Sequence, residues 1–582
     1  MARKSRWLAL LVALVMLVSL SACGSSQTNE SSSTDNQASN TNSQQTKKLG
    51  TIDGKDPETG LPMLADRNNP ITFKVFLGSP GQAPAKDNPV IKKITELTGV
   101  TIDFEFLVGD LSQKVGVMIA GGDYPDAINV DDAQKFIEAG AYIPLDDKLP
   151  NYPNLNDLYL PFKEDLTAKY GKTYILELYN VYTPELAPPI FDNGGAGFFM
   201  QKDVIAESGY KVPRTLDDYF GMIEAYAAKH PTVDGVKTRG FEILCDGWRD
   251  FCLRNPAQHL LGDGNNGDAT VDYKTNTAYF YQITDTAKNY YKKLNEEYHK
   301  GIIIPDTFTQ SYDQYLSRIS SGAVLGMFDQ RWNFADGENA LKADEKWNRT
   351  YVSLPITNPG VKDGYLDAPN GHITGINGIG ITIKCKDPDR LLEFYDYLLQ
   401  REVQDYLQWG VEGKDWVKAG ENDKVLTAER RALNYDTAKA RDLTGVTLWN
   451  YSPKRQGRYP DGAPCGPGDS VAEYKASQSD YDKGFLKALK IDYPAQLLSE
   501  PVKRPAYYPI WAMPIEEGKG AAGAAQTAMI DVCRKYYPKL IMCDPGEYDS
   551  LWNEFVSAFN AANPQPYLDE INKYIKEKLG QN

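Results

Sequence analysis

The sequence predicts an α/β protein of two lobes, each built around its own sheet. Three observations lead to this expectation. Segments with strand and helix periodicity alternate early in the chain, the same alternation returns far downstream, and 582 residues are too many for a single core. Hydrophobic residues make up 42% of the chain, which is enough for globular packing.

The first folded stretch has the pattern of a strand, a helix and a second strand. Residues Ile71–Phe76 and Val100–Phe106 alternate apolar and polar side chains, as half-buried strands do. Between them Pro89 opens a helix with one apolar face, and Gly99 closes it. This βαβ unit predicts a parallel strand pair with a right-handed crossover. A further helix that ends at two glycines precedes a third short strand, Ala127–Val130.

The same order of elements recurs downstream. Residues Tyr312–Ile319 are predicted to form a helix that ends near Gly322, and Val324–Phe328 form the strand after it. Gly378–Ile383 is a further strand, and Asp387–Pro388 caps the helix that follows. Repeated α/β units so far apart in the sequence indicate two lobes with separate sheets.

The amino-terminal segment has the pattern of a secretory signal. Basic residues precede the apolar run Trp7–Leu20, which is shorter than the roughly 20 residues of a membrane-spanning helix. The order Leu20-Ser21-Ala22-Cys23 resembles a bacterial lipobox, which implies that Cys23 is lipidated and becomes the mature terminus. The alternative is an ordinary signal peptide whose cleavage site contains a cysteine. We expect a protein anchored by lipid on the outer face of the cell membrane.

The composition limits the ligands and gives no fixed disulfide pattern. A net charge of −15 argues against nucleic acid and against an anionic membrane patch. The 37 tyrosines and 9 tryptophans suit carbohydrate recognition, and an ordinary core equally well. Six cysteines follow Cys23; Cys245 with Cys252 and Cys533 with Cys543 are plausible pairs, and free buried thiols are as plausible. Without a C-x-x-C motif, a redox or zinc site has no support.

Five short segments, in this order along the chain, resemble a known family: Met118–Asp126, Ala141–Asp147, Lys211–Tyr219, Gly301–Asp306 and Trp409–Trp416. The family is that of the large oligosaccharide-type solute-binding lipoproteins of ABC importers (extracellular solute-binding protein family 1). The resemblance implies a periplasmic-binding-protein-like fold, with discontinuous lobes and a ligand cleft between them. It also implies capture of an oligosaccharide, delivery to permease subunits, no catalysis, no cofactor and a monomer.

The expected division of the chain follows from the signal and the resemblance. It comprises a signal peptide (1–22), a lipidated cysteine with a disordered polar tether (23–66), lobe 1 (67–190 plus 376–445) and lobe 2 (191–375 plus 446–582). Some relatives carry a calcium loop where this chain has Pro231–Thr238. Because that segment offers one carboxylate, and hard cations want about six or more oxygens, no metal is expected there.

The strongest candidate site lies directly after the strand Val324–Phe328. Ligands of open parallel sheets bind beyond the carboxyl ends of the strands. Asp329 and Arg331 could hold sugar hydroxyls through charge-assisted hydrogen bonds, while Trp332 stacks on a pyranose face. A buried ion pair and a core tryptophan are the alternative.

Further candidates lie near other predicted strand ends or in loops. Asp123 and Asp126 precede the third strand, where a solvated turn is equally plausible. Trp248 follows the strand-like residues 241–244, and Trp511 lies in a proline-bounded loop. Trp552 has helical spacing with apolar neighbours and is predicted to be core.

Catalytic motifs are scarce. Gly262–Gly267 matches G-x-G-x-x-G without the flanking strand and helix, so we expect a surface turn; a minor cation loop using Asp263 and Asp268 is the alternative. No H-E-x-x-H, Walker A or G-x-S-x-G motif occurs. The alternative functions are an anchored glycoside hydrolase, which needs only two carboxylates, and a surface adhesin. A peptide in place of the sugar also remains possible.

Overall fold

The computed structural model describes residues 50–581, except residues 131, 132, 169, 372, 374, 376, 514, 516 and 517. The predicted signal peptide, Cys23 and the tether up to residue 49 lie outside the described residues. Among the described helices, none combines the length and apolar character needed to span a lipid bilayer.

The first sheet contains five strands in the order β4-β3-β5-β15-β6. Strands β3 (Ile71–Leu77), β4 (Val100–Phe106) and β5 (Ala127–Val130) are parallel, which confirms the predicted βαβ unit. Strand β15 (Gly378–Ile381) runs antiparallel between β5 and β6 (Ile175–Leu176). Because β15 comes from far downstream, this lobe is discontinuous in sequence.

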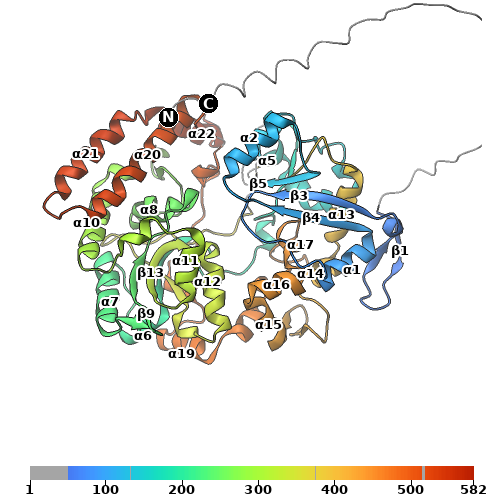
Figure 1. Cartoon of the computed structure of the whole chain (residues 1–582), viewed down its shortest axis with the longest axis horizontal. Coiled ribbons are helices and arrows are strands. Elements are labelled where there is room, and N and C mark those ends of the chain that lie inside the picture. The colour runs from blue at the N-terminus through green and yellow to red at the C-terminus, as the bar shows by residue number, and fades with distance from the viewer. Residues whose placement is uncertain are drawn as a thin grey trace, which may run out of the picture. The chain divides into compact units, whose positions relative to one another are not determined.

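Local sequence explains the helices around this sheet. Helix α1 (Pro89–Thr98) begins where the Asn88 side chain accepts hydrogen bonds from two backbone N–H groups, and it ends at Gly99 with φ of 72°. Figure 1 shows α1 in blue beside β4. Helix α13 (Pro388–Leu398) is capped as predicted, because the Asp387 side chain accepts from the backbone N–H of Arg390. Other helices of this part are α2 (Leu111–Gly121), α4 (Pro153–Tyr159), α14 (Arg401–Gln408) and α17 (Val446–Asn450).

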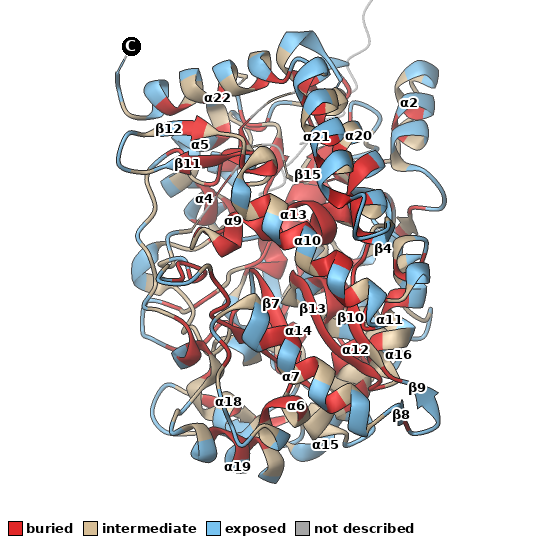
Figure 2. Ribbon diagram, turned by 90° about the vertical axis from the view of Figure 1, so that its left-hand side faces the viewer, coloured by how far each residue is buried: buried red, intermediate tan, exposed pale blue. Residues whose placement is uncertain are grey.

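The second sheet contains four strands in the order β10-β13-β7-β14. Strand β10 (Arg239–Glu242) is parallel to β13 (Val324–Gln330), and β7 (Ala196–Gln201) is antiparallel to both β13 and β14 (Tyr351–Leu354). The carboxyl ends of β10 and β13 therefore share one edge with the amino end of β7. Figure 2 shows β7, β10 and β13 in red, as buried strands.

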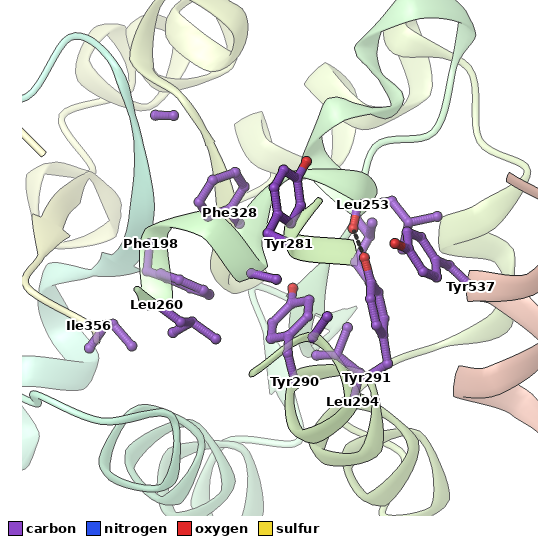
Figure 3. Packing of buried hydrophobic residues seen from close by; sticks show 14 of the residues in the cluster. Phe198, Leu253, Leu260, Tyr281, Tyr290, Tyr291, Leu294, Phe328, Ile356 and Tyr537 are labelled. Atoms are coloured by element: carbon purple, nitrogen blue, oxygen red, sulfur yellow. Dashed lines mark hydrogen bonds between the residues drawn. The ribbon is translucent and has the colours of Figure 1, made fainter. Parts of the chain in front are cut away.

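Aromatic side chains dominate the core beside the second sheet. Tyr291 stacks on Tyr537 with ring centroids 3.9 Å apart, and its hydroxyl donates to the carbonyl of Leu253 at 2.9 Å (Figure 3). Trp552 packs within this core, as predicted. The main helices here are α7 (Leu216–Lys229), α10 (Asp285–His299), α11 (Tyr312–Ser320), α12 (Arg331–Ala343), α18 (Val471–Ser477), α19 (Asp480–Leu489), α20 (Gly520–Met542), α21 (Tyr548–Ala561) and α22 (Gln565–Lys578).

Two expectations about the chain differ from the structure. The tether was predicted to continue to residue 66, but β1 (Ile52–Lys55) pairs with β2 (Pro62–Leu64). The reason is that Leu61 and Leu64 are buried in the core of the first sheet. The six described cysteines are free thiols, so neither plausible disulfide forms.

Candidate functional site

Two half-exposed tryptophans stack on each other beyond the carboxyl ends of β10 and β13. Trp332 follows β13 directly, and Trp248 lies in the turn just beyond β10. Their rings stack with centroids 5.8 Å apart and an interplanar angle of 19°. Trp248 is 54% exposed and Trp332 49% exposed. We call this pair the tryptophan platform; parallel pairing of β10 with β13 brings the two rings together, as expected from the rule of strand ends.

Neighbouring side chains hold the tryptophan platform in place. The Arg249 guanidinium lies 4.5 Å from the centroid of the Trp248 ring and 3.9 Å from that of Tyr312. Nε of Arg249 donates to Oδ1 of Asn333 at 3.0 Å. On the other ring, Nε1 of Trp332 donates to Oε1 of Gln330 at 2.9 Å. The platform is thus preorganised, and its exposed apolar face fits the C–H face of a pyranose ring.

A cavity of about 420 Å³ adjoins the tryptophan platform through Gln330, which lines the cavity and accepts from Trp332; Trp248 and Trp332 themselves do not line it. The segments 180–196 and 365–370 contribute much of its wall, and they belong to the connections that run between the two sheets. We call it the cleft pocket. Trp511 also lines it and is 48% exposed. Other polar lining residues are Asn265, Arg504 and Tyr508.

Both carboxylates in the wall of the cleft pocket have arginine partners. Asp367 accepts from Nε of Arg504 at 2.6 Å and from the Tyr508 hydroxyl at 3.0 Å. Asp192 lies 2.8 Å from Nη2 of Arg331. Burial raises the pKa of Asp192, although the charge of Arg331 acts in the opposite direction. Both carboxylates of this wall are therefore engaged in ion pairs.

Asp329 does not reach the site surface, contrary to the role predicted from the sequence. It is fully buried and accepts hydrogen bonds from the Tyr315 hydroxyl at 2.6 Å, Nδ2 of Asn333 at 2.9 Å and Sγ of Cys252 at 3.3 Å. Because Asn333 also holds Arg249, Asp329 supports the platform from below. The Arg331 side chain is 19% exposed and is engaged by Asp192 at 2.8 Å and by the buried Glu338 at 2.7 Å.

The burial of Asp329 makes a specific pH dependence of stability testable. Desolvation raises the pKa of Asp329 to about 6, although Tyr315 donates to it. Between about pH 4 and pH 6 the folded protein therefore holds this proton more tightly than the unfolded chain does, so the free energy of unfolding falls as pH rises through this window. The loss is about 3 kcal/mol. In Asp329→Asn this contribution is absent, so the free energy of unfolding, measured by chemical unfolding, should fall less between about pH 4 and pH 6 than in the wild type. An unchanged pH dependence would assign the effect to another group.

The structure places Asp123 and Asp126 at the wrong end of a strand for ligand contact. Both precede β5, so they lie at the amino end of the parallel strands rather than at the carboxyl end. Asp126 is buried and accepts from the backbone N–H groups of Lys74 at 2.8 Å and Lys386 at 2.9 Å. Asp126 therefore fixes the sheet edge, and Asp123 is exposed beside it.

The glycine-rich segment Gly262–Gly267 is not the expected surface turn. Asp263 within it is buried, accepting from Nδ2 of Asn266 at 2.9 Å and from the Tyr273 hydroxyl at 3.0 Å, and it lies 3.3 Å from Nη1 of Arg504. Asp268 pairs with an arginine as well. Among the described residues, no group of three or more histidine, cysteine or carboxylate side chains is arranged to hold a metal ion.

Some lining residues were missed because nothing in the local sequence distinguishes them. Arg504 and Asp367 meet in the cleft pocket although they lie far apart in the chain, and neither belongs to a periodic pattern. Asn265 could have been noticed only through its glycine-rich neighbourhood. The exposed tryptophans, in contrast, carried a usable signal, because a large ring after a strand or between prolines is seldom needed for a core.

Comparisons with known proteins give related sequences. The profile of the bacterial extracellular solute-binding proteins matches residues 90–410. The fructooligosaccharide ABC transporter substrate-binding protein FusA of Streptococcus pneumoniae is 26% identical over 372 residues, which cover 59% of this chain and 64% of FusA. The polygalacturonan/rhamnogalacturonan-binding protein YtcQ of Bacillus subtilis is 22% identical over 385 residues, covering 61% of this chain and 68% of YtcQ.

Solved structures share the fold. FusA in complex with kestose superposes with a TM-score of 0.59 at 18% identity, over 88% of this chain and 100% of that chain. An HMO-binding, ABC-transporter-associated solute-binding protein of Bifidobacterium longum infantis gives a TM-score of 0.57 at 15% identity, over 87% of this chain and 99% of that chain. The two-lobed α/β fold predicted from the sequence is confirmed.

Proposed function

The chain belongs to the bacterial extracellular solute-binding proteins, and on this basis we propose that it captures an oligosaccharide and delivers it to the permease of an ABC transporter. The observation that carries the proposal is the tryptophan platform beside the cleft pocket. Stacked, exposed indole rings next to amide and guanidinium groups provide both contacts that a sugar needs, an apolar face and hydrogen bonds at its rim.

The similarity to named sugar binders supports this ligand class. The name of FusA specifies fructooligosaccharide, and that of YtcQ specifies polygalacturonan and rhamnogalacturonan. The segments that line the cleft pocket also connect the two sheets, so rotation about them would let both lobes close on a ligand. We further propose lobe boundaries near those predicted, a monomer, a lipid anchor at Cys23 and a location on the outer face of the membrane.

Calorimetry with a panel of oligosaccharides tests the proposed function. We expect at least one neutral or acidic oligosaccharide to bind. By X-ray scattering, the complex should have a smaller radius of gyration than the protein without ligand. Assay of reducing ends in the same mixtures separates binding from hydrolysis, and no new ends are expected. Failure of every saccharide to bind, or cleavage of one, would contradict the proposal.

Trp511 is expected to add a second stacking surface within the cleft pocket. Trp511→Ala should weaken oligosaccharide binding about threefold to tenfold, because one exposed ring face of the lining is lost. Trp449→Ala, which removes a half-buried indole that does not line this pocket, is the matched control. Equal affinities of the two variants by calorimetry would remove Trp511 from the site.

A further inference from the structure

A second and larger hollow, of about 980 Å³, lies between α18, α19 and the segment before β7. Figure 2 shows α18 and α19 beside each other. We call it the lysine groove, because four lysines contribute to its lining: Lys475, Lys483, Lys487 and Lys490. Lys483 and Lys487 are one helical turn apart on α19, so their ammonium groups lie on one face.

The positive charge of the lysine groove is largely uncompensated. Of its described lining residues, Asp492 alone carries a carboxylate. Lys483 lies 3.3 Å from Asp480, which is fully exposed to solvent. The other three lysines are exposed and form no ion pair within the described part of the chain. This local positive charge contrasts with the net charge of −15 of the whole chain, and it favours an anionic ligand.

Aromatic rings form the lining between these lysines. Phe191 stacks on Tyr474 with centroids 4.2 Å apart and planes 10° from parallel, and Tyr493 meets Phe191 edge-on at 6.3 Å. All three residues line the groove. A hollow that offers ring faces and ammonium groups together matches a sugar that carries carboxylates.

The lysine groove adjoins the cleft pocket. Pro189 and Ile190 contribute to the lining of both hollows, so an extended ligand that passes this segment can reach from one to the other. A peptide or a lipid headgroup would not need this adjacency. A flat membrane would also meet a protruding face more readily than a concave one.

We propose that the lysine groove binds the carboxylates of a uronate-bearing oligosaccharide whose other end occupies the cleft pocket. This inference rests on the proposed function and adds the ligand class. The bound chain places its carboxylates beside the ammonium groups of α19 and packs a ring against Phe191 and Tyr474. Neutral oligosaccharides use the cleft pocket alone.

The test compares uronate-bearing oligosaccharides, such as oligogalacturonates and oligoalginates, with their carboxyl-reduced counterparts by calorimetry on the purified protein. We expect an acidic form to bind at least about tenfold more tightly at low salt. In the double variant Lys483→Gln/Lys487→Gln the affinity advantage of the acidic form should fall to about twofold. For the wild type, about 1 M salt should reduce the same advantage to a similar extent, because the Debye length is then about 3 Å.

Lys535→Gln/Lys539→Gln is the matched control, because it removes two exposed charges at the same spacing on α20, also next to a tyrosine ring. It should retain the full advantage. The inference would be overturned if no acidic oligosaccharide bound more tightly than its carboxyl-reduced form, or if both double variants lost this advantage equally. Binding of the neutral oligosaccharides would still support the proposed function in either case. Lysine-dependent binding to phosphatidylglycerol vesicles without preference for acidic sugars would assign the groove to lipid and overturn it too.

Discussion

Replacing Trp332 with alanine is expected to weaken oligosaccharide binding at least tenfold, or about 1.4 kcal/mol. The substitution removes half of the tryptophan platform and leaves the exposed face of Trp248 without its stacking partner. It also frees Oε1 of Gln330, which then accepts from water instead of from the indole. Central aromatic side chains of this kind carry a large part of binding energy in interfaces.

Two companion variants sharpen this result. Trp332→Phe keeps a flat ring and should retain most of the affinity, while losing the hydrogen bond to Gln330. Trp347→Ala removes a half-buried indole that contacts Tyr435 and lines no part of the cleft pocket, so its affinity should match that of the wild type. Unchanged affinity of Trp332→Ala by calorimetry would remove the residue from the site.

Replacing Arg331 with methionine is expected to lower the free energy of unfolding by about 3–5 kcal/mol. Nη1 of Arg331 lies 2.7 Å from Glu338, and Nη2 lies 2.8 Å from Asp192. The guanidinium is also held between the rings of Phe199 and Phe334, 5.3 and 5.5 Å from their centroids. Methionine fills the space but removes the guanidinium from two carboxylates. Glu338 is buried and keeps Lys342 at 3.3 Å, whereas Asp192 is 26% exposed, so the cost arises mainly at Glu338.

Urea unfolding of this variant can be compared with Arg401→Met. Arg401 pairs with Asp461 at 2.6 Å, but both side chains are more than two fifths exposed. The loss there should stay within about 1 kcal/mol, since water screens an exposed pair. Similar losses for both variants would show that the buried cluster around Arg331 contributes no more than a surface ion pair.

Sequence periodicity predicted the elements well where strands alternate or helices carry caps. Strands β3, β4 and β5 and helices α1 and α13 were located closely. Strand β7 was not predicted, because all of its residues are buried and no alternation marks it. The antiparallel direction of β15 depends on partners contributed by other parts of the chain, which no local pattern encodes.

The candidate site was predicted in part. Trp248, Trp332 and Trp511 were chosen because bulky rings followed strands or prolines, and all three are exposed. Asp329 and Arg331 have side chains well suited to a sugar, yet Asp329 is fully buried and Arg331 is engaged by Asp192 and Glu338. Neither fact can be read from four consecutive residues. Asp126 was misplaced because it precedes β5, whereas ligands bind beyond the carboxyl ends of parallel strands.

The stacking of Trp248 on Trp332 gives the molecule an intrinsic optical signal for occupancy. Two indoles at this separation couple electronically, and water now reaches both of them. A sugar that covers their outer face would displace that water and shift their emission to shorter wavelength, while the buried indoles of Trp409, Trp416 and Trp552 supply a constant background. Ligand screening by fluorescence thus requires no dye and no engineered label.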